Sequence, residues 1–402
     1  MPSIVNPAST YQPGNMKLFP AENRSCSVLP LLRTLALHRY YTHRLRSAYL
    51  PRPSPQALLP KLLPHGVTSV IRLPPIPHSR IALMPPETAS AVAQRAAQLE
   101  NAVREIIRGK DDIIRLALVS LLARGHLLIE GVPGVGKTTL GQALARALDC
   151  SFQRVQFTSD MLPSDVLGIS IYSAIEQQFE FKRGPVFTNV LLADEINRTT
   201  PKTQSALLEA MNEGQVTMDA HSYSLPQPFL VIATQNPVEH HGTYPLPESQ
   251  LDRFLIRARM GYPDSDAERE ILRSEAGSAR LETMRAVLSG SDVLDLQQAV
   301  TRVRVDESLV EYALTIVRKT RESESLSLGV SPRGSQMLYR AAQAMAFLSG
   351  RNFCTPEDFK PLVVPVFAHR VVVNGTYAST LKKSEQAELL ITEIVESTPL
   401  PV

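Results

Sequence analysis

Cysteine is scarce in this chain of 402 residues, which contains only Cys26, Cys150 and Cys354. The three lie far apart, and none belongs to a C-x-x-C pair. This pattern argues against a disulfide framework and against a cysteine-based zinc site, and it is typical of buried apolar residues in a reducing compartment. We therefore expect a cytoplasmic protein.

Long apolar runs are missing as well. No run approaches the roughly 18 residues that a membrane-spanning helix requires, so we expect no transmembrane segment. The N-terminal part also lacks an apolar stretch followed by a small-residue cleavage site, which argues against a secretory signal.

Acidic residues are almost missing from residues 1–83, which contain ten Lys or Arg and a single acid, Glu22. The other 32 basic and 38 acidic residues fall in residues 84–402 and give that part a net charge of −6. The basic pI near 8.7 therefore comes from the N-terminal stretch. Because the remainder is mildly acidic, we expect no nucleic-acid partner.

Residues 1–83 also hold 13 of the 31 prolines and show no sustained helix or strand period, because proline interrupts both kinds of element. Three interpretations stay open. The stretch is a disordered basic tail, an Arg-rich organelle transit peptide, or an over-extended start ahead of a true first residue at Met84. We predict a disordered or mis-assigned extension and no function for it.

One short string carries the strongest chemical signal. Residues 131–138 read GVPGVGKT, follow the apolar run HLLIEG and lead into a helix-like stretch, which is the context that a phosphate-binding loop needs. Its backbone N–H groups can surround phosphate oxygens, Lys137 can reach the β- and γ-phosphates, and the Thr138 hydroxyl can bind Mg²⁺. The predicted nucleotide contacts are Gly131, Val132, Pro133, Gly134, Val135, Gly136, Lys137, Thr138 and Thr139.

A second string, NVLLADEINR over residues 189–198, is an apolar strand that ends in two carboxylates. Asp194 suits the Mg²⁺ shell together with Thr138, and Glu195 is placed to polarise an attacking water. Asn236 ends another apolar strand, FLVIATQN. Since ligands bind at the carboxyl ends of parallel strands, these side chains are expected around one γ-phosphate. ATP and Mg²⁺ are therefore the predicted ligands, and hydrolysis is the predicted reaction.

The order of elements predicts an α/β fold. Across residues 84–262, apolar strands alternate with helix-like stretches, which indicates a parallel sheet with helices on both faces. Residues 263–402 show helical patterns and predict a smaller, all-helical domain.

These motifs together identify a family. The chain resembles the AAA+ ATPases and, within them, the MoxR family. Besides the phosphate loop, the resemblance rests on VQFTSDMLPSDVLG, FKRGPVFTNVLLADEINR, TPKTQSALLEAMNEGQV, PFLVIATQNPVEHHGTYPLPESQLDRF, GVSPRG and TPEDFKPLVVPVFAHR. It covers roughly residues 95–390 in the expected order.

The resemblance implies roles for further residues. Asn236 corresponds to the sensor-1 position, Arg253 to an arginine finger that acts in its own subunit or a neighbour, and Arg333 to sensor 2 on a small helical lid. Ile107 to Gly109 fall where this class brackets the adenine, although the string IRGKDD departs from the usual VGQ-like pattern.

The resemblance further implies a Mg²⁺-dependent ATPase that forms a ring of six subunits and remodels protein partners. In the family such partners are typically proteins with a von Willebrand factor A domain, and the outcome is chaperone-like assembly or metal insertion. Two alternatives stay open at this point: a magnesium-chelatase-like motor subunit, with the same site residues, and a nucleic-acid-acting AAA+ loader.

Overall fold

The computed structural model describes residues 86–236, 243–273, 277–375 and 380–401. The predictions made for residues 1–83 therefore lie outside the described residues. The described residues belong to one compact unit, Ser79–Val402. Among them, no helix is both long and apolar enough to cross a membrane.

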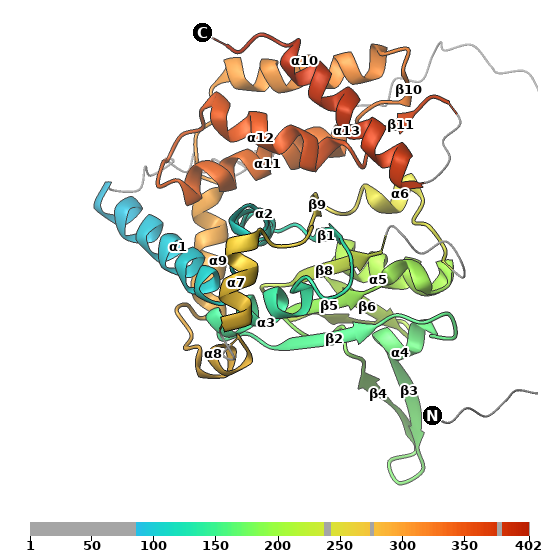
Figure 1. The fold of residues 1–402 in the computed structure, drawn as a ribbon. Coiled ribbons are helices and arrows are strands. Elements are labelled where there is room, and N and C mark those ends of the chain that lie inside the picture. The colour runs from blue at the N-terminus through green and yellow to red at the C-terminus, as the bar shows by residue number, and fades with distance from the viewer. Residues whose placement is uncertain (1–85, 237–242, 274–276, 376–379, 402) are drawn as a thin grey trace, which may run out of the picture. The chain divides into compact units, whose positions relative to one another are not determined.

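A parallel five-stranded sheet lies at the centre of this unit, as predicted (Figure 1). Its strand order is β2-β5-β8-β1-β9, so strands that follow one another in sequence are mostly not neighbours. The strands are β1 (Leu127–Glu130), β2 (Phe152–Gln156), β5 (Val190–Asp194), β8 (Leu230–Gln235) and β9 (Ile256–Arg259).

Both faces of the sheet are buried. Successive side chains on a strand point to opposite faces, and along β1 this places Leu127 and Ile129 in one apolar core and Leu128 in a second. Along β5, Leu192 and Leu191 divide in the same way. The uninterrupted apolar strands of the sequence are thus explained by two cores, one on each face.

The helices and hairpins of the nucleotide-binding part cover these faces. They are α1 (Pro86–Ile106), α2 (Asp111–Leu122), α3 (Lys137–Ala147), α4 (Pro163–Leu167), the 3₁₀ turn η1 (Ile196–Arg198), α5 (Pro201–Glu213) and α6 (Glu248–Leu251). This part also contains two antiparallel hairpins: β3 (Gly168–Ser173) with β4 (Gln178–Arg183), which extends away from the sheet in Figure 1, and β6 (Gln215–Met218) with β7 (His221–Ser224).

The C-terminal part is helical, as predicted. Its helices are α7 (Ser265–Arg273), α8 (Gly277–Thr283), α9 (Gly290–Val300), α10 (Glu307–Glu322), α11 (Pro332–Leu348), α12 (Pro356–Phe367) and α13 (Thr380–Glu396). It also contains a short antiparallel pair that the helical pattern did not indicate, β10 (Leu326–Leu328) with β11 (Val372–Val373). The β-branched run at 371–373 favours this extended pairing.

The C-terminal helices pack directly on the nucleotide-binding part. Figure 1 shows α11 and α12 close to α2 and β9, and residues of these elements are in contact. One apolar core runs without a break from β1 and α3 to α11 and α12. The domain boundary near residue 262 stays a prediction, because the apolar core continues across it from one part to the other.

Candidate active site

The loop 131–136 connects the end of β1 to the start of α3. Gly134 has φ +83° and Gly136, the N-cap of α3, has φ +96°, which are conformations that favour glycine. A Cβ atom on Gly131 would lie 2.4 Å from the carbonyl oxygen of Met260, so no other residue fits there without a shift. The glycines therefore let the backbone curl tightly at the N-terminus of a helix, where anions bind.

Lys137 is the first residue of α3 and is buried. Its Nζ donates a hydrogen bond to the carbonyl oxygen of Gly131 at 2.8 Å, which closes the loop on itself. Burial lowers the pKa of Lys137, while attraction by Asp194 and Glu195 opposes this shift. The ammonium group thus lies between the loop and the two carboxylates, as a phosphate-binding lysine should.

Asp194 is buried at the end of β5, and both its oxygens have partners. Thr234 Oγ1 donates to Oδ1 at 2.6 Å, and Arg154 Nη2 donates to Oδ2 at 2.6 Å. Arg154 comes from β2, which pairs with β5 in parallel. Asp194 therefore has a neutralising cation in addition to Lys137.

Glu195 has a left-handed backbone with φ 58°, and its N–H donates to Thr234 Oγ1 at 2.9 Å. Its Oε2 accepts from Gln156 Nε2 at 2.6 Å and from Arg198 Nη1 at 3.0 Å. The two adjacent carboxylates are thus held by different side chains and point to different partners, which matches different tasks.

Arg154, Gln156 and Thr234 were missed in the sequence. A signal was present, because each lies within the last three residues of a strand whose C-terminal end adjoins that of β5. Gln156 is paired in register with Asp194 itself. The strand order was needed to use this signal, since these residues lie about forty positions from their partners.

Asn236 directly follows β8 and is buried. Because β8 lies between β5 and β1, Asn236 lies at the same sheet edge as the phosphate loop and Asp194. This is the placement expected from its sequence position.

The two predicted arginines lie at the opposite end of the strands, where β1 and β9 begin. Arg253 comes three residues before β9, whose Ile256 pairs with Leu127 at the start of β1. Its Nη1 donates to the carbonyl oxygen of Leu208 in α5 at 2.7 Å. The phosphate loop follows the other end of β1, so Arg253 is a whole strand length away from the loop of its own chain.

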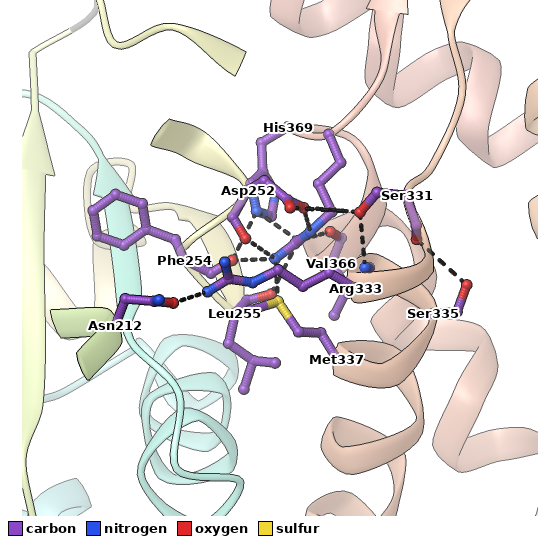
Figure 2. Close-up of polar contacts among 12 residues, drawn as sticks. Asn212, Asp252, Phe254, Leu255, Ser331, Arg333, Ser335, Met337, Val366 and His369 are labelled. Carbon is purple, nitrogen blue, oxygen red and sulfur yellow. Dashed lines mark hydrogen bonds and ion pairs between the residues drawn. The ribbon is translucent and has the colours of Figure 1, made fainter. Parts of the chain in front are cut away.

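Arg333 is placed similarly. It lies in the first turn of α11, and its Nη2 donates to Asn212 Oδ1 near the end of α5 at 2.6 Å (Figure 2). The neighbouring Met211 carbonyl contacts His126, which directly precedes β1. The guanidinium groups of both arginines therefore contact α5, near the N-terminal end of β1.

Ile107 to Gly109 connect α1 to α2. Ile107 is buried, and Gly109 has φ +65°. A Cβ on Gly109 would lie 2.6 Å from Cβ of Ala267 in α7, so this segment contacts the first helix of the C-terminal part. Contact with an adenine stays a prediction.

The donor set suits Mg²⁺. The Thr138 hydroxyl and the Asp194 carboxylate are oxygen ligands, which Mg²⁺ prefers. Among the described residues, no group of three or more His, Cys, Asp or Glu side chains is placed to hold a metal ion. Two protein oxygens fit a cation that takes its remaining ligands from phosphates and water.

Comparison with known families agrees with this geometry. Residues 126–256 match the sequence model of the "ATPase family associated with various cellular activities (AAA)", and residues 318–394 match an "AAA lid domain". The first match spans β1, the phosphate loop, both carboxylates and Arg253.

Comparison with individual proteins extends over most of the chain. Chaperone MoxR1 of Mycobacterium tuberculosis is 40% identical over 79% of this chain and 86% of its own length. The Bacillus subtilis protein YeaC is 49% identical over 75% of this chain and 93% of its own length. A crystal structure from Cytophaga hutchinsonii, described as an ATPase candidate, is 37% identical, has a TM-score of 0.71, and aligns over 79% of this chain and 98% of its own.

Proposed function

Because the chain belongs to the MoxR family of AAA+ ATPases, we propose that it works as a closed ring of identical subunits in which arginines of one subunit complete the nucleotide site of the next. The chain is an ATP hydrolase of this chaperone family. Ring formation, the roles of individual residues and the partner protein are the parts that we propose.

The observation that carries the proposal is the separation of Arg253 and Arg333 from the phosphate loop. The loop follows Glu130, whereas both arginines lie at the edge where β1 begins. The four residues of β1 span about 13 Å at about 3.3 Å per residue, and the lengths of loop and side chain add to this. An arginine at one end of the strands reaches a phosphate at the opposite end in a neighbouring subunit that is arranged head to tail, and such an assembly closes as a ring when the rotation between subunits closes.

In the proposed site, each residue has one task. Lys137 and the loop backbone bind the phosphates, and Glu195 polarises the attacking water from a position fixed by Gln156 and Arg198. Asn236, as a neutral amide, orients that water or a phosphate oxygen without adding charge. Thr138 and Asp194 would hold Mg²⁺, which when bound neutralises charge on the phosphate oxygens.

The neighbouring subunit would supply Arg253, and Arg333 with it. Charge builds on the equatorial oxygens of the transferred phosphoryl group, and a forked guanidinium stabilises it better than a point charge does. Hydrolysis by one subunit would then depend on contact with the next.

The hairpin β3–β4 supports a protein partner. It carries several exposed apolar side chains, and Tyr172 and Phe179 contact each other edge-to-face with ring centroids 5.4 Å apart. Phe179 is 71% exposed. Exposed apolar side chains that are grouped on one element are typical of protein contact sites. We therefore propose chaperone-like remodelling or assembly of a protein partner, with a von Willebrand factor A domain protein and metal insertion as the specific possibilities to test.

The test is sedimentation of the full chain with and without Mg²⁺ and a non-hydrolysable ATP analogue, with the ATPase rate per subunit measured against protein concentration. We expect a nucleotide-dependent ring and a rate that rises on assembly. Arg253→Ala should form the ring but lose at least about 10³-fold in turnover, the order of magnitude of an arginine finger.

Arg318→Ala is the matched control, because Arg318 is an exposed arginine on α10 that pairs with Glu311. Its rate should match that of the unchanged protein. A monomer whose turnover does not depend on concentration would refute the ring, and stimulation by DNA would favour the nucleic-acid alternative.

A further inference from the structure

Arg370, just after α12, is the most deeply buried guanidinium at the contact between the C-terminal helices and β9 among the described residues, with a side chain that is 1% exposed. Its Nε donates to Asp252 Oδ1 at 2.9 Å. Its two terminal nitrogens donate to the backbone carbonyl oxygens of Asp252, Phe254 and Leu255. One guanidinium of the lid thus holds the backbone on both sides of Arg253.

This contact is charged and strongly held. Burial lowers the pKa of Arg370 to about 10, and Asp252 opposes the shift, so the group stays ionised at neutral pH. The adjacent His369 is neutral, because burial and the charges of Arg370 and Arg257 lower its pKa. A buried charge that loses its partner is strongly destabilised, so the segment around Arg253 must follow Arg370 when the lid moves.

Asp252 also reaches the helix that carries the second arginine. Ser331 Oγ lies 3.4 Å from each oxygen of the Asp252 carboxylate (Figure 2). Ser331 is the N-cap of α11, where it accepts a hydrogen bond from the N–H of Gly334. Arg333 lies between these two residues. The start of α11 and the loop before β9 are therefore bound to one carboxylate.

We propose that Asp252 and Arg370 are positioning residues that hold Arg253 and Arg333 in one fixed relation, so that a movement of the lid presents or withdraws both arginines together. The inference rests on the proposed action of these arginines in a neighbouring subunit. It adds a physical link between the lid position of one subunit and the nucleotide site of the next. Because such coupling is reciprocal in binding, nucleotide affinity at either site would depend on occupancy of the other by the same factor.

The two arginines themselves are consistent with joint movement. Arg253 and Arg333 both end on the last part of α5, at Leu208 and Asn212. α5 follows the Asp194-Glu195 pair after the short turn η1. When the lid moves, both side chains must leave or reach this helix together, because Asp252 links their backbones.

The experiment uses Arg370→Lys, which keeps the charge but loses the forked donors, and Asp252→Asn, which keeps the volume but loses the charge. Both are made in the full chain. Affinity for a fluorescent ATP analogue and ring formation by sedimentation are measured first. We expect both to stay within about twofold of the unchanged protein, whereas turnover in the ring falls by at least about tenfold, a fraction of the loss that removal of a finger causes.

Rings that contain two different variants then distinguish a loss of arginine positioning from a general defect of the altered subunit. Glu195→Gln subunits should bind nucleotide and offer intact arginines, but they do not hydrolyse. When Glu195→Gln subunits are mixed with Arg370→Lys subunits, the Arg370→Lys sites should recover turnover, because their neighbours supply intact arginines. A parallel mixture of Glu195→Gln with Arg253→Ala subunits should recover turnover in the same way. Rescue of Arg253→Ala without rescue of Arg370→Lys or Asp252→Asn would overturn the inference and leave the proposed function standing. If mixed rings form and Arg253→Ala is not rescued, the action in the neighbour is itself refuted, and the inference fails with it.

A second measurement asks whether Arg370 acts through the two arginines. In an Arg253→Ala, Arg333→Ala background, Arg370→Lys should cause no further loss of turnover. An equal fold-loss in this background and in the unchanged protein would show that Arg370 acts by another route and would overturn the proposal.

Discussion

At the scale of single residues, the two adjacent carboxylates differ in what surrounds them. Asp194 is held by Arg154 and Thr234, and Glu195 by Gln156 and Arg198. Asp194 therefore lies in a buried setting where Arg154 already compensates its charge. Glu195 is fixed by one amide and one guanidinium on a single oxygen, which leaves its other oxygen available to a water.

The first prediction concerns this division. Glu195→Gln keeps the shape of the side chain and its contact with Arg198 through the amide oxygen, but it removes the base. We expect nucleotide affinity within about twofold of the unchanged protein and turnover lower by about 10²–10⁴-fold, the usual contribution of a general base. Single-turnover hydrolysis and equilibrium nucleotide binding measure the two. Glu322→Gln, at an exposed position on α10, is the control, and hydrolysis unchanged in Glu195→Gln would remove Glu195 from the mechanism.

The second prediction concerns Arg154, which the sequence motifs do not include. Its guanidinium is bound to Asp194 and would compete with a cation for that carboxylate. Arg154→Gln should therefore lower the Mg²⁺ concentration needed for half-maximal nucleotide binding, by up to about fivefold, since Arg154 is partly exposed and such pairs contribute about 1 kcal/mol or less. Nucleotide binding titrated against Mg²⁺ measures this directly. A higher Mg²⁺ requirement would mean that Arg154 supports the metal site instead.

At the scale of elements, His126 joins three of them. It precedes β1, its Nε2 lies 3.0 Å from the carbonyl oxygen of Met211 in α5, and its Nδ1 accepts from the N–H of Val231 in β8. Only the neutral ring with its proton on Nε2 makes both bonds. Full burial accordingly lowers the pKa of His126 to about 4.

This burial predicts a pH dependence of folding. The folded pKa is depressed from 6.5 to about 4, so the unfolded chain binds the proton more readily. Stability from His126 is present above about pH 6.5 and is lost as the pH falls toward about 4. At about pH 5 the loss from this residue is about 2 kcal/mol, at 1.36 kcal/mol per pKa unit.

The measurement is urea unfolding of the unchanged protein and of His126→Gln at about pH 7.5 and about pH 5. Gln can still donate to Met211 but does not titrate. The difference in free energy of unfolding between the two proteins should shrink at the lower pH. A difference that stays constant between the two pH values would refute the role given to His126.

At the scale of the whole molecule, the described part of the chain shares one apolar core between the sheet and the lid. Ile114 and Leu118 of α2, Leu140 of α3 and Leu338 of α11 belong to the same buried cluster. The lid therefore provides one wall of the core that covers the sheet. In a ring, a movement of the lid would therefore change its packing on its own sheet as well as its contact with the next subunit.

A shared core predicts joint unfolding. Calorimetry of the protein without nucleotide should show one transition for the nucleotide-binding part and the lid together, although chains of this length often unfold in several steps. Leu338→Ala, in the lid, should lower that single transition and cost about 2–5 kcal/mol, as buried leucines do. Two separate transitions, of which Leu338→Ala lowers the midpoint temperature of only one, would show that the lid unfolds alone.

The motifs of the sequence already predicted the phosphate loop, Asp194, Glu195 and the parallel sheet. The loop and the two carboxylates are determined by short stretches, because a glycine-rich turn between a strand and a helix, or a carboxylate at a strand end, needs only local backbone geometry. The sheet followed from the alternation of apolar strands and helices along residues 84–262. The family followed from the same strings, and the comparisons confirm it.

The tertiary structure alone decided where the remaining groups meet. Arg370 and Asp252 lie 118 positions apart, and Arg154 and Asp194 lie 40 apart. Their contacts depend on strand order and on how the lid packs, which are properties of the whole core. For the same reason, the sequence could name Arg253 and Arg333 as site residues but left open which subunit's phosphate they serve. The tertiary structure places both away from their own loop, Arg253 through the pairing of β9 with β1 and Arg333 through its hydrogen bond to Asn212 in α5.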